Sequence, residues 1–459
     1  MQPPSDVFRE YDVRGVAGRD LKASLAFALG RAVATTVRRG GGRRVIAGRD
    51  CRISGEELCN ALCQGLAASG CDVLEAGLIP TPVAYWGIHH LAADGAVQVT
   101  GSHNPPEYNG FKLTLLGASL HGEDIQKLRR VIEEEDFAEG KGRRQARPLL
   151  ADYLDDLAAS LQPAGRPFKV VIDAGNGMGG LTALPLYRKL GYQVVPLYTE
   201  PDGNFPHHHP DPTVEKNLAD LKAAVARERA DVGIAFDGDA DRIGVIDKGG
   251  EVVWGDRLLI LLARDVLAQA PGATIIGEVK CSQTLYDDIA KHGGKPIMWR
   301  TGHSLIKSKM KETGALLAGE MSGHIFFKHR YYGFDDAVYA GARLLEILSR
   351  DRRTVSEHLA DVPLMVATPE IRLDCPESLK FRLVAEVTRR FKARALGEGW
   401  RVIDIDGARV ETADGWALVR CSNTQPLLVL RFEAKTAERL AVLQALIEGE
   451  IERVHKELA

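Results

Sequence analysis

Short apolar runs rich in β-branched residues alternate with longer amphipathic stretches over the first three-quarters of the chain. This alternation predicts three units in which parallel strands are joined by crossover helices. In each unit an unusual polar loop follows a late strand, and open α/β sheets bind ligands beyond the carboxyl ends of their strands. We therefore expect the three loops to contribute to one cleft. The early and late strands predicted for the three units are 44–48 and 96–100, 169–173 and 232–236, and 273–277 and 315–319.

The last quarter of the chain has a different pattern. A short strand at 371–373 precedes an amphipathic helix over 377–394, and the turn signals Asp406-Gly407 and Asp414-Gly415 separate alternating runs typical of antiparallel hairpins. A final charged amphipathic helix is expected over 436–455. The predicted fold class is therefore α/β, with three topologically similar mixed α/β domains plus a C-terminal α+β domain, all four around a central cleft. The predicted domain boundaries are 1–147, 148–250, 251–365 and 366–459.

Composition narrows the class of protein. Hydrophobic residues make up 45% and charged residues 26% of the 459, which is ordinary for a globular protein and excludes wholesale disorder. The 59 Lys and Arg against 62 Asp and Glu give a net charge of −3, so there is no basic excess to attract nucleic acid or an anionic membrane. We expect neither partner, and any anionic ligand must be held by a few placed cations.

The seven cysteines are odd in number and irregular in spacing. Reduced cysteines packed as small hydrophobic residues explain them better than disulfides or a metal site. Residues 1–10 lack the apolar core of a signal peptide, and the longest apolar run, 258–263, is far too short to span a bilayer. We expect a soluble, cytoplasmic protein that acts as a monomer.

The first polar loop, at residues 100–106, places Ser102 at the end of a strand. Gly101 beside it allows close approach of the backbone to a ligand. A serine in this place is either a nucleophile or phosphate carrier, or an ordinary turn or capping serine. His103 and Asn104 add only modest support for the first interpretation.

The second polar loop carries three carboxylates at alternating positions, those of Asp237, Asp239 and Asp241. Crowding them without a cation is costly, and an all-oxygen ligand set indicates Mg²⁺ or Ca²⁺. An EF-hand is excluded because its sixth and twelfth positions require Gly and Glu, where this loop has Arg242 and Lys248. A solvated acidic turn is the alternative. Arg242 beside the metal suggests a phosphate gripped from two sides.

Two further loops have polar side chains suited to a phosphorylated sugar. Glu320 and Ser322 point the same way in an extended segment, and a carboxylate can accept hydrogen bonds from two adjacent sugar hydroxyls. Arg420, followed by small donors over 421–425, makes a concavity apt for a phosphate. Taken singly, Glu and Ser near glycines more often serve as turn residues, and the Arg420 loop is equally well read as a polar hairpin loop.

The four loops together closely resemble those of the α-D-phosphohexomutase superfamily and, within it, the bacterial phosphomannomutase/phosphoglucomutase enzymes. The resemblance covers essentially the whole chain, with all four loops in family order and at family-like spacing. It implies an isomerase that interconverts mannose 1-phosphate with mannose 6-phosphate and glucose 1-phosphate with glucose 6-phosphate. It also implies a phosphoserine enzyme, one Mg²⁺ per chain, and glucose 1,6-bisphosphate as activator and reorienting intermediate. The partners would be small phosphosugars.

The resemblance also implies roles for individual residues. Ser102 would be the phosphoserine and, with Asp237, Asp239 and Asp241, a ligand of the metal. Lys112, Arg242 and His303 would serve near the reacting oxygen as general acid or base or as electrostatic stabilisers. The residues expected to contact the substrate are Tyr11, Arg14, His103, Lys280, Glu320, Ser322, Arg420, Ser422, Asn423 and Thr424.

Several positions differ from the family or between its branches. The usual metal loop has Gly where Ala240 stands, and an alanine at a positive φ would cost about 1 kcal/mol or more. Phosphoglucosamine mutases usually have Gln in place of Met321 and Ala in place of Gly101, so both positions favour the mannose/glucose branch. The run 207–209 of three histidines lies in a proline-containing loop, and we interpret it as structural, without a metal.

Two other classes of protein are weighed against the mutase. A haloacid-dehalogenase-like phosphatase would use Asp237 as its nucleophile, but Asp241 replaces the expected Thr or Val and the Ser102 and Arg420 loops would have no purpose. A Mg²⁺-dependent sugar-phosphate sensor would lack Ser102, Lys112 or His303, and all three are present. The mutase is the better interpretation.

Overall fold

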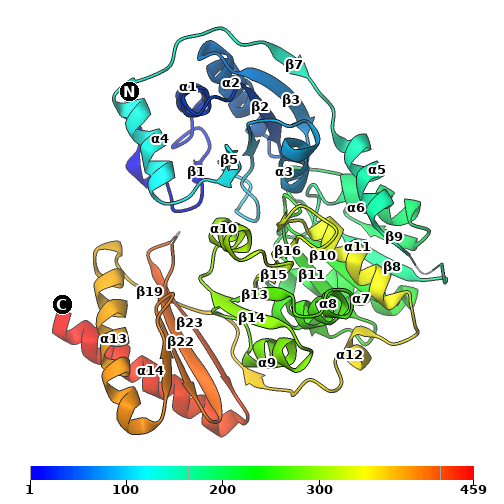
Figure 1. The fold of residues 1–459 in the computed structure, drawn as a ribbon, viewed down its shortest axis with the longest axis vertical. Coiled ribbons are helices and arrows are strands. Elements are labelled where there is room, and N and C mark those ends of the chain that lie inside the picture. The colour runs from blue at the N-terminus through cyan, green and yellow to red at the C-terminus, as the bar shows by residue number, and fades with distance from the viewer. Residues whose placement is uncertain (1, 164, 424, 459) are drawn as a thin grey trace.

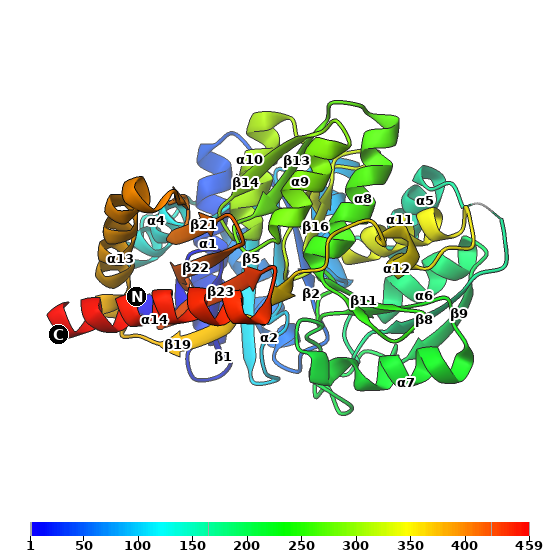
Figure 2. The same cartoon turned by 90° about the horizontal axis from the view of Figure 1, so that it is seen from below.

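The computed structural model describes residues 2–163, 165–423 and 425–458. Within them the chain folds into four domains that follow one another along the sequence, each built from a sheet and its helices (Figure 1). The first three domains form one side of the molecule, and the C-terminal domain lies at its edge (Figure 2). The predicted fold class is confirmed.

The first domain is built on a mixed sheet with strand order β1-β5-β4-β2-β3-β7 and with β6 paired to β5. Its central strands are parallel and almost fully buried, as a sheet covered by helices on both faces requires. Its elements are η1 (Ser5–Val7), β1 (Val13–Val16), α1 (Ala23–Arg39), β2 (Arg44–Arg49), α2 (Gly55–Ala68), β3 (Asp72–Leu78), α3 (Thr81–His90), β4 (Gly95–Val99), β5 (Tyr108–Leu115), β6 (Ala118–Ser119), α4 (Glu123–Glu133) and β7 (Arg144–Ala146).

The second and third domains repeat this arrangement with shorter sheets, ordered β12-β11-β10-β8-β9 and β14-β13-β15-β16-β17. The elements of the second are α5 (Leu150–Ser160), β8 (Lys169–Asp173), α6 (Gly180–Lys189), β9 (Gln193–Leu197), η2 (Glu215–Leu218), α7 (Ala219–Glu228), β10 (Val232–Phe236), β11 (Ile243–Asp247) and β12 (Val252–Val253). Those of the third are α8 (Gly255–Gln269), β13 (Thr274–Glu278), α9 (Gln283–Lys291), β14 (Lys295–Trp299), α10 (His303–Thr313), β15 (Leu317–Gly319), β16 (Ile325–Phe327), β17 (Phe334–Asp335), α11 (Ala337–Leu348) and α12 (Val355–His358).

The fourth domain packs two long helices on an antiparallel sheet ordered β18-β23-β22-β21-β20, with β19 paired to β23. The hairpin signals of the sequence fall between β20 and β21 and between β21 and β22. Its elements are β18 (Val366–Ala367), β19 (Ile371–Asp374), α13 (Glu377–Glu398), β20 (Arg401–Ile403), β21 (Ala408–Thr412), β22 (Gly415–Cys421), β23 (Leu427–Ala434) and α14 (Ala437–Leu458).

The hydrophobic core is shared unequally among the domains. One large buried cluster includes Ile46 of the first domain, Ile172 of the second and Leu317 of the third. Helix α11 of the third domain packs against β10 and β11 of the second. The fourth domain has a core of its own and meets the third through a small cluster of Val279, Trp416 and Leu418.

The cysteines and the apolar helices agree with the sequence interpretation. All seven cysteines are free thiols, five of them buried. Within the described residues, none of the helices combines the length and apolar character that a membrane crossing requires.

Candidate active site

In each of the first three domains the polar loop lies between a buried parallel strand and an antiparallel return strand. These pairs are β4 and β5, β10 and β11, and β15 and β16. Two contacts between the loops bring the carboxyl ends of the three buried strands together, as predicted. Ser102 Oγ donates a hydrogen bond to Asp237 Oδ2 at 2.8 Å, which joins the first two loops. A backbone bridge between Arg242 and His324 joins the second to the third.

The Ser102 loop is held by Arg52, which sequence reasoning missed. Its guanidinium is fully buried and donates to the carbonyls of four residues between Ser102 and Tyr108, at 2.5–2.9 Å. Asp50 balances the charge, with its Oδ2 at 3.2 Å from Arg52 Nε. The loop holds Ser102 at a φ of +48°, a left-handed conformation that a free chain seldom adopts at serine. Nothing local in the sequence indicates that an arginine beyond β2 supports a loop fifty residues later.

The carboxylates of Asp237, Asp239 and Asp241 are completely buried, and one oxygen of each lies within 4.8 Å of the others. Burial, together with the charges of the other two carboxylates, raises the pKa of Asp237. Oδ1 of Asp239 is buried and has no hydrogen-bond partner among the described residues. Buried anionic oxygens with an unsatisfied ligand atom fit a hard divalent cation. Ala240 lies between Asp239 and Asp241 and has a φ of +61°. It therefore has the positive φ at which an alanine is expected to be strained.

Lys112 and His303 face this cluster from the first and third domains. Lys112 Nζ donates to Asp239 Oδ2 at 2.7 Å and to Asp241. His303 is the first residue of α10, and its Nδ1 is 3.8 Å from the nearest oxygen of Asp335. Burial, reinforced by the charges of Lys307 and Lys112, lowers the pKa of His303 well below that of an ordinary histidine. His303 is therefore neutral near pH 7.

The third loop gathers Glu320, Ser322 and His324. Ser322 Oγ donates to Glu320 Oε2 at 3.1 Å, and His324 Nδ1 is 2.6 Å from the same oxygen. His324 Nε2 is 3.3 Å from Asp241 Oδ1, so its ring links the sugar-loop carboxylate to the acidic cluster. His324 is a site residue that the sequence interpretation did not include. Its signal was its place in the same loop, four residues after Glu320.

The fourth loop lies across the site at the end of β22. Arg420 is buried, and its Nε donates to Asp406 Oδ2 at 2.9 Å. Asn423 donates to the hydroxyl of Tyr11, which connects this loop to the first domain. The backbone of Ser422 is fixed by the buried Lys380, whose Nζ donates to its carbonyl at 2.6 Å. Thr424 lies outside the described residues.

Arg14, His103 and Lys280 were also predicted to contact the substrate, and each has a different partner within the protein. Arg14 donates to Asn104 in the serine loop. His103 Nδ1 is 3.2 Å from Asp211 Oδ2, and burial and the charge of Arg242 lower the pKa of His103 to about 4. Lys280 Nζ donates to Glu370 at 3.0 Å in the segment that enters the fourth domain.

The structural role of the three histidines at 207–209 stays a prediction, and the structure gives the polar partners of their rings. His208 Nε2 is 2.9 Å from Asp173, His207 Nδ1 is 2.7 Å from Asn176, and His209 contacts the carbonyl of His103. Each ring thus has a different polar partner, and the metal-type clusters found among the described residues do not include them.

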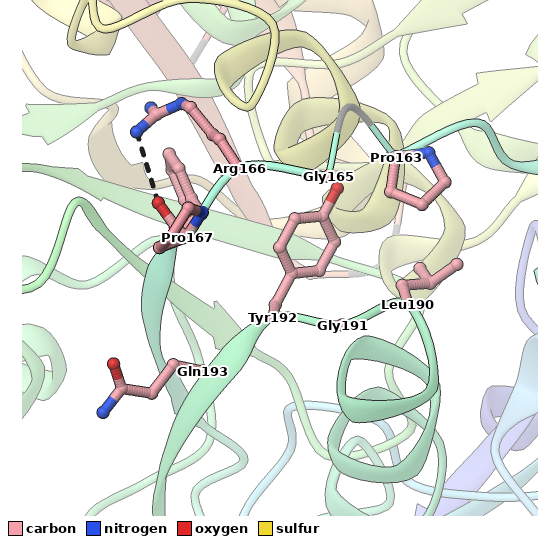
Figure 3. A pocket seen from close by; sticks show the side chains of 9 residues that line it. Pro163, Gly165, Arg166, Pro167, Leu190, Gly191, Tyr192 and Gln193 are labelled. Carbon is pink, nitrogen blue, oxygen red and sulfur yellow. Dashed lines mark hydrogen bonds between the residues drawn. The ribbon is translucent and has the colours of Figure 1, made fainter.

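A pocket of about 360 Å³ lies in the second domain, away from the four loops (Figure 3). Arg166 is the charged residue among those described at its wall, and it donates to the carbonyls of Pro167 and Leu348. The pocket holds none of the predicted site residues. Its lining consists of Pro163, Gly165, Arg166, Pro167, Phe168, Leu190, Gly191, Tyr192 and Gln193.

Four domains whose polar loops contact one another define a multidomain α/β protein with a buried acidic site, and comparisons with known proteins identify its family. The chain matches all four models of phosphoglucomutase/phosphomannomutase: α/β/α domain I at residues 5–139, domain II at 151–250, domain III at 254–365 and the C-terminal domain at 370–449. The chain belongs to the phosphoglucomutase/phosphomannomutase family, and the resemblance predicted from its loops is confirmed.

Relatives cover the chain almost from end to end. A phosphomannomutase/phosphoglucomutase of Pseudomonas aeruginosa is 48% identical over 455 residues, 99% of this chain and 97% of that protein. A phosphoglucomutase of Neisseria gonorrhoeae is 46% identical over 450 residues, 97% of each chain. A crystal structure of a phosphoglucomutase/phosphomannomutase family protein from Burkholderia thailandensis is 44% identical, with a TM-score of 0.92 over 99% of this chain and 98% of that one.

Proposed function

We propose that this protein is a phosphohexomutase that interconverts the 1- and 6-phosphates of mannose and of glucose. The observation that carries the proposal is the hydrogen bond between Ser102 and Asp237, which brings a nucleophilic hydroxyl to a buried acidic cluster that fits a divalent cation. Arg420 lies in a separate loop suited to a second phosphate. The names of relatives at 46–48% identity support the same reaction.

The first half-reaction transfers the phosphoryl group from phospho-Ser102 to the free 6-hydroxyl of a hexose 1-phosphate. The bond from Ser102 Oγ to phosphorus breaks and a bond from O6 to phosphorus forms. The proton of the 6-hydroxyl passes to a neighbouring base, and the departing Ser102 Oγ takes up a proton. His303, which is neutral and which the family resemblance places near the reacting oxygen, is the residue assigned to the role of that base. The product is a hexose 1,6-bisphosphate and a free Ser102 hydroxyl.

Asp237, Asp239, Asp241 and Ser102 are the residues that would hold Mg²⁺. When bound, Mg²⁺ neutralises the charge that spreads over the transferring phosphoryl oxygens. Lys112 and Arg242 add fixed positive charge beside the same oxygens, in a buried environment where such charges act strongly. The chain's own contribution is therefore positioning plus cationic stabilisation.

The second half-reaction requires the bisphosphate to turn round within the site. Its 1-phosphate then faces Ser102. The bond from O1 to phosphorus breaks, the Ser102 hydroxyl gives up its proton to a neighbouring base as Oγ regains the phosphoryl group, and O1 takes up a proton. Glu320 and Ser322 lie close enough to hold two adjacent hydroxyls in either orientation. The Arg420 loop would bind whichever phosphate is distal to Ser102.

The same arrangement predicts relaxed recognition of the sugar. Glucose and mannose differ only in the configuration at C2. A site that holds the 3- and 4-hydroxyls through Glu320 and Ser322 does not depend on that difference, so both sugars should be substrates.

The test is a ³¹P NMR time course of mannose 1-phosphate with Mg²⁺ and a trace of glucose 1,6-bisphosphate. Conversion to mannose 6-phosphate is the expected result, and glucose 1-phosphate in a parallel tube should give glucose 6-phosphate. Release of inorganic phosphate alone would replace the mutase by a phosphatase. No conversion of either sugar would overturn the proposed function.

A further inference from the structure

Asp406 connects the phosphate-binding arginine of the fourth domain to a turn of the third. Its side chain is only 9% exposed, and its Oδ2 accepts hydrogen bonds from Arg420 Nε at 2.9 Å and from the backbone N–H of Thr301 at 3.1 Å. We propose that Asp406 is a positioning residue that orients Arg420 for the distal phosphate and ties it to the turn that precedes His303. This inference rests on the proposed function of the Arg420 loop.

The bond at Nε determines which edge of Arg420 is available. Among residues 2–163, 165–423 and 425–458, Nε is the atom of this guanidinium that forms a side-chain hydrogen bond. A guanidinium held at Nε keeps the fork of its two Nη groups for a phosphate, which two parallel N–H donors bind with defined geometry. The Asp406 carboxylate also supplies the counter-charge that a buried arginine needs before the phosphate arrives.

The chain forces Asp406 close to Arg420. Gly407, which follows it, has a φ of +80°. A Cβ at this position would lie 2.2 Å from the carbonyl oxygen of Val419 and 2.8 Å from the Cα of Arg420. The tight Asp-Gly turn predicted from the sequence therefore packs closely against the end of β22, which brings Asp406 next to Arg420. A turn alone does not require that this aspartate also bind the backbone of another domain.

The Thr301-Gly302 turn that Asp406 binds is itself a junction of the site. Tyr11 Oη donates to the Thr301 carbonyl at 2.9 Å, and the N–H of Gly302 donates to Glu320 Oε1 at 2.7 Å. Gly302 has a φ of +135°, and a Cβ there would lie 2.6 Å from the Tyr11 ring. Two consecutive peptide units, 300–301 and 301–302, therefore link Asp406, Tyr11 and the sugar-loop carboxylate. Through them, Asp406 sets the distance between the distal phosphate and the sugar hydroxyls.

The experiment compares Asp406→Asn with Asp404→Asn in the full-length protein. Asparagine keeps the size of the side chain and one acceptor for Thr301 but loses the charge facing Arg420. Asp404 provides the matched control because it is 48% exposed and pairs with Lys392 at the surface. We expect Asp406→Asn to raise KM for glucose 1-phosphate by about tenfold or more, the size of a lost charge-assisted hydrogen bond, with kcat changed less than about threefold.

A second readout separates positioning from general weakening of the fold. A loosely held distal phosphate lets the bisphosphate escape while it turns, so Asp406→Asn should need several-fold more added glucose 1,6-bisphosphate for half-maximal activity. Loss of the counter-charge to Arg420 should lower its thermal midpoint below that of Asp404→Asn, but the variant should remain folded at the assay temperature. If Asp406→Asn does not fold, Asp406→Ser, which keeps a turn-forming side chain, takes its place.

The outcomes separate this inference from the proposed function. Unchanged KM and bisphosphate requirement relative to Asp404→Asn would overturn the role of Asp406 while the mutase stands. A fall in kcat at unchanged KM would overturn it as well. If the parent protein converts neither sugar, calorimetric titration with glucose 1,6-bisphosphate still decides. Weaker binding by Asp406→Asn than by Asp404→Asn supports the role, and equal binding overturns it.

Discussion

Ser102 combines three properties that an ordinary capping serine does not need. It is 2% exposed, has a left-handed φ of +48°, and donates to a carboxylate of another domain. Ser102→Ala should lower mutase turnover by at least about 10³-fold, because the group that carries the phosphoryl is gone. Calorimetry should find sugar-phosphate binding in the presence of Mg²⁺ little changed, because Arg420 and Glu320 remain.

The matched control for this variant is Ser160→Ala. Ser160 ends α5 in the second domain, and its hydroxyl donates to the carbonyl of Leu157 within that helix. Its replacement should leave turnover at the parent value. Near-normal turnover in Ser102→Ala would remove this serine from the mechanism.

Ala240 has a backbone conformation that favours glycine, and it is fully buried. Ala240→Gly should relieve about 1–2 kcal/mol of left-handed strain. It also loses about 0.8 kcal/mol of methyl burial and up to about 1 kcal/mol through the more flexible unfolded chain. We therefore expect the free energy of unfolding, measured in urea, to change by less than about 1 kcal/mol.

Ala92 tests this balance because it has a similar φ of +47° but is exposed. Ala92→Gly loses no buried methyl, so it should stabilise the protein by about 0.5 kcal/mol relative to Ala240→Gly. A larger gain from Ala240→Gly than from Ala92→Gly would contradict the assigned strain and burial.

His103 predicts a dependence of stability on pH. Burial and Arg242 lower its pKa to about 4, although Asp211 opposes them. An unfolded histidine has a pKa near 6.5, so the unfolded chain binds more protons between pH 6.5 and pH 4. Stability therefore falls as the pH drops from about 6.5 towards 4. His103→Gln should lose about 2 kcal/mol less than the parent between pH 7 and pH 4.5 in urea unfolding. Parallel curves for the two proteins would contradict the lowered pKa.

At the scale of elements, the serine loop depends on one side chain from a neighbouring strand end. Arg52→Met removes the donor to four backbone carbonyls and leaves the buried Asp50 without its counter-charge. We expect a loss of about 3 kcal/mol or more in the free energy of unfolding, together with lower turnover.

Arg49→Met is the comparison for this loop. Arg49 lies at the end of the same strand, and its partner Glu56 is 83% exposed at 3.4 Å. A surface pair of this kind contributes less than about 1 kcal/mol. Equal losses in the two variants would mean that Arg52 does not hold the loop.

Local patterns predicted most elements, while contacts between distant segments escaped them. The alternation of apolar runs and amphipathic stretches predicted β4, β10 and β15, and with them the loops that follow. The support of the serine loop by Arg52 and the bond of Asp406 to Thr301 join residues 50 or more positions apart, and one sequence has no local signal for such pairs. His324 was missed for a different reason, because a histidine near a glycine turn is common.

At the scale of the whole molecule, packing separates the fourth domain from the other three. The first three domains share one hydrophobic cluster, whereas the fourth has its own core and meets the third through Val279, Trp416 and Leu418. Two buried arginines add polar contacts at this junction, including bonds from Arg409 to the carbonyls of Val279 and Cys281 at 2.8 and 2.7 Å. Towards the first domain, the described side-chain hydrogen bond is that between Asn423 and Tyr11.

This asymmetry predicts that the fourth domain moves on its contact with the third to admit and enclose the reorienting bisphosphate. A mobile domain is expected where the interface is small, and substrate that bridges two domains favours the closed form. Small-angle scattering should therefore show a smaller radius of gyration with glucose 1,6-bisphosphate than without it. Glucose, which lacks both phosphates, should leave the radius unchanged.

Asn423→Ala, which removes the bond to Tyr11, should enlarge the ligand-free form and leave the liganded form nearly as compact as the parent. Identical scattering curves with and without the bisphosphate would mean that the sugar turns inside a site of fixed width, and the Arg420 loop would then have to reach both phosphates without domain movement.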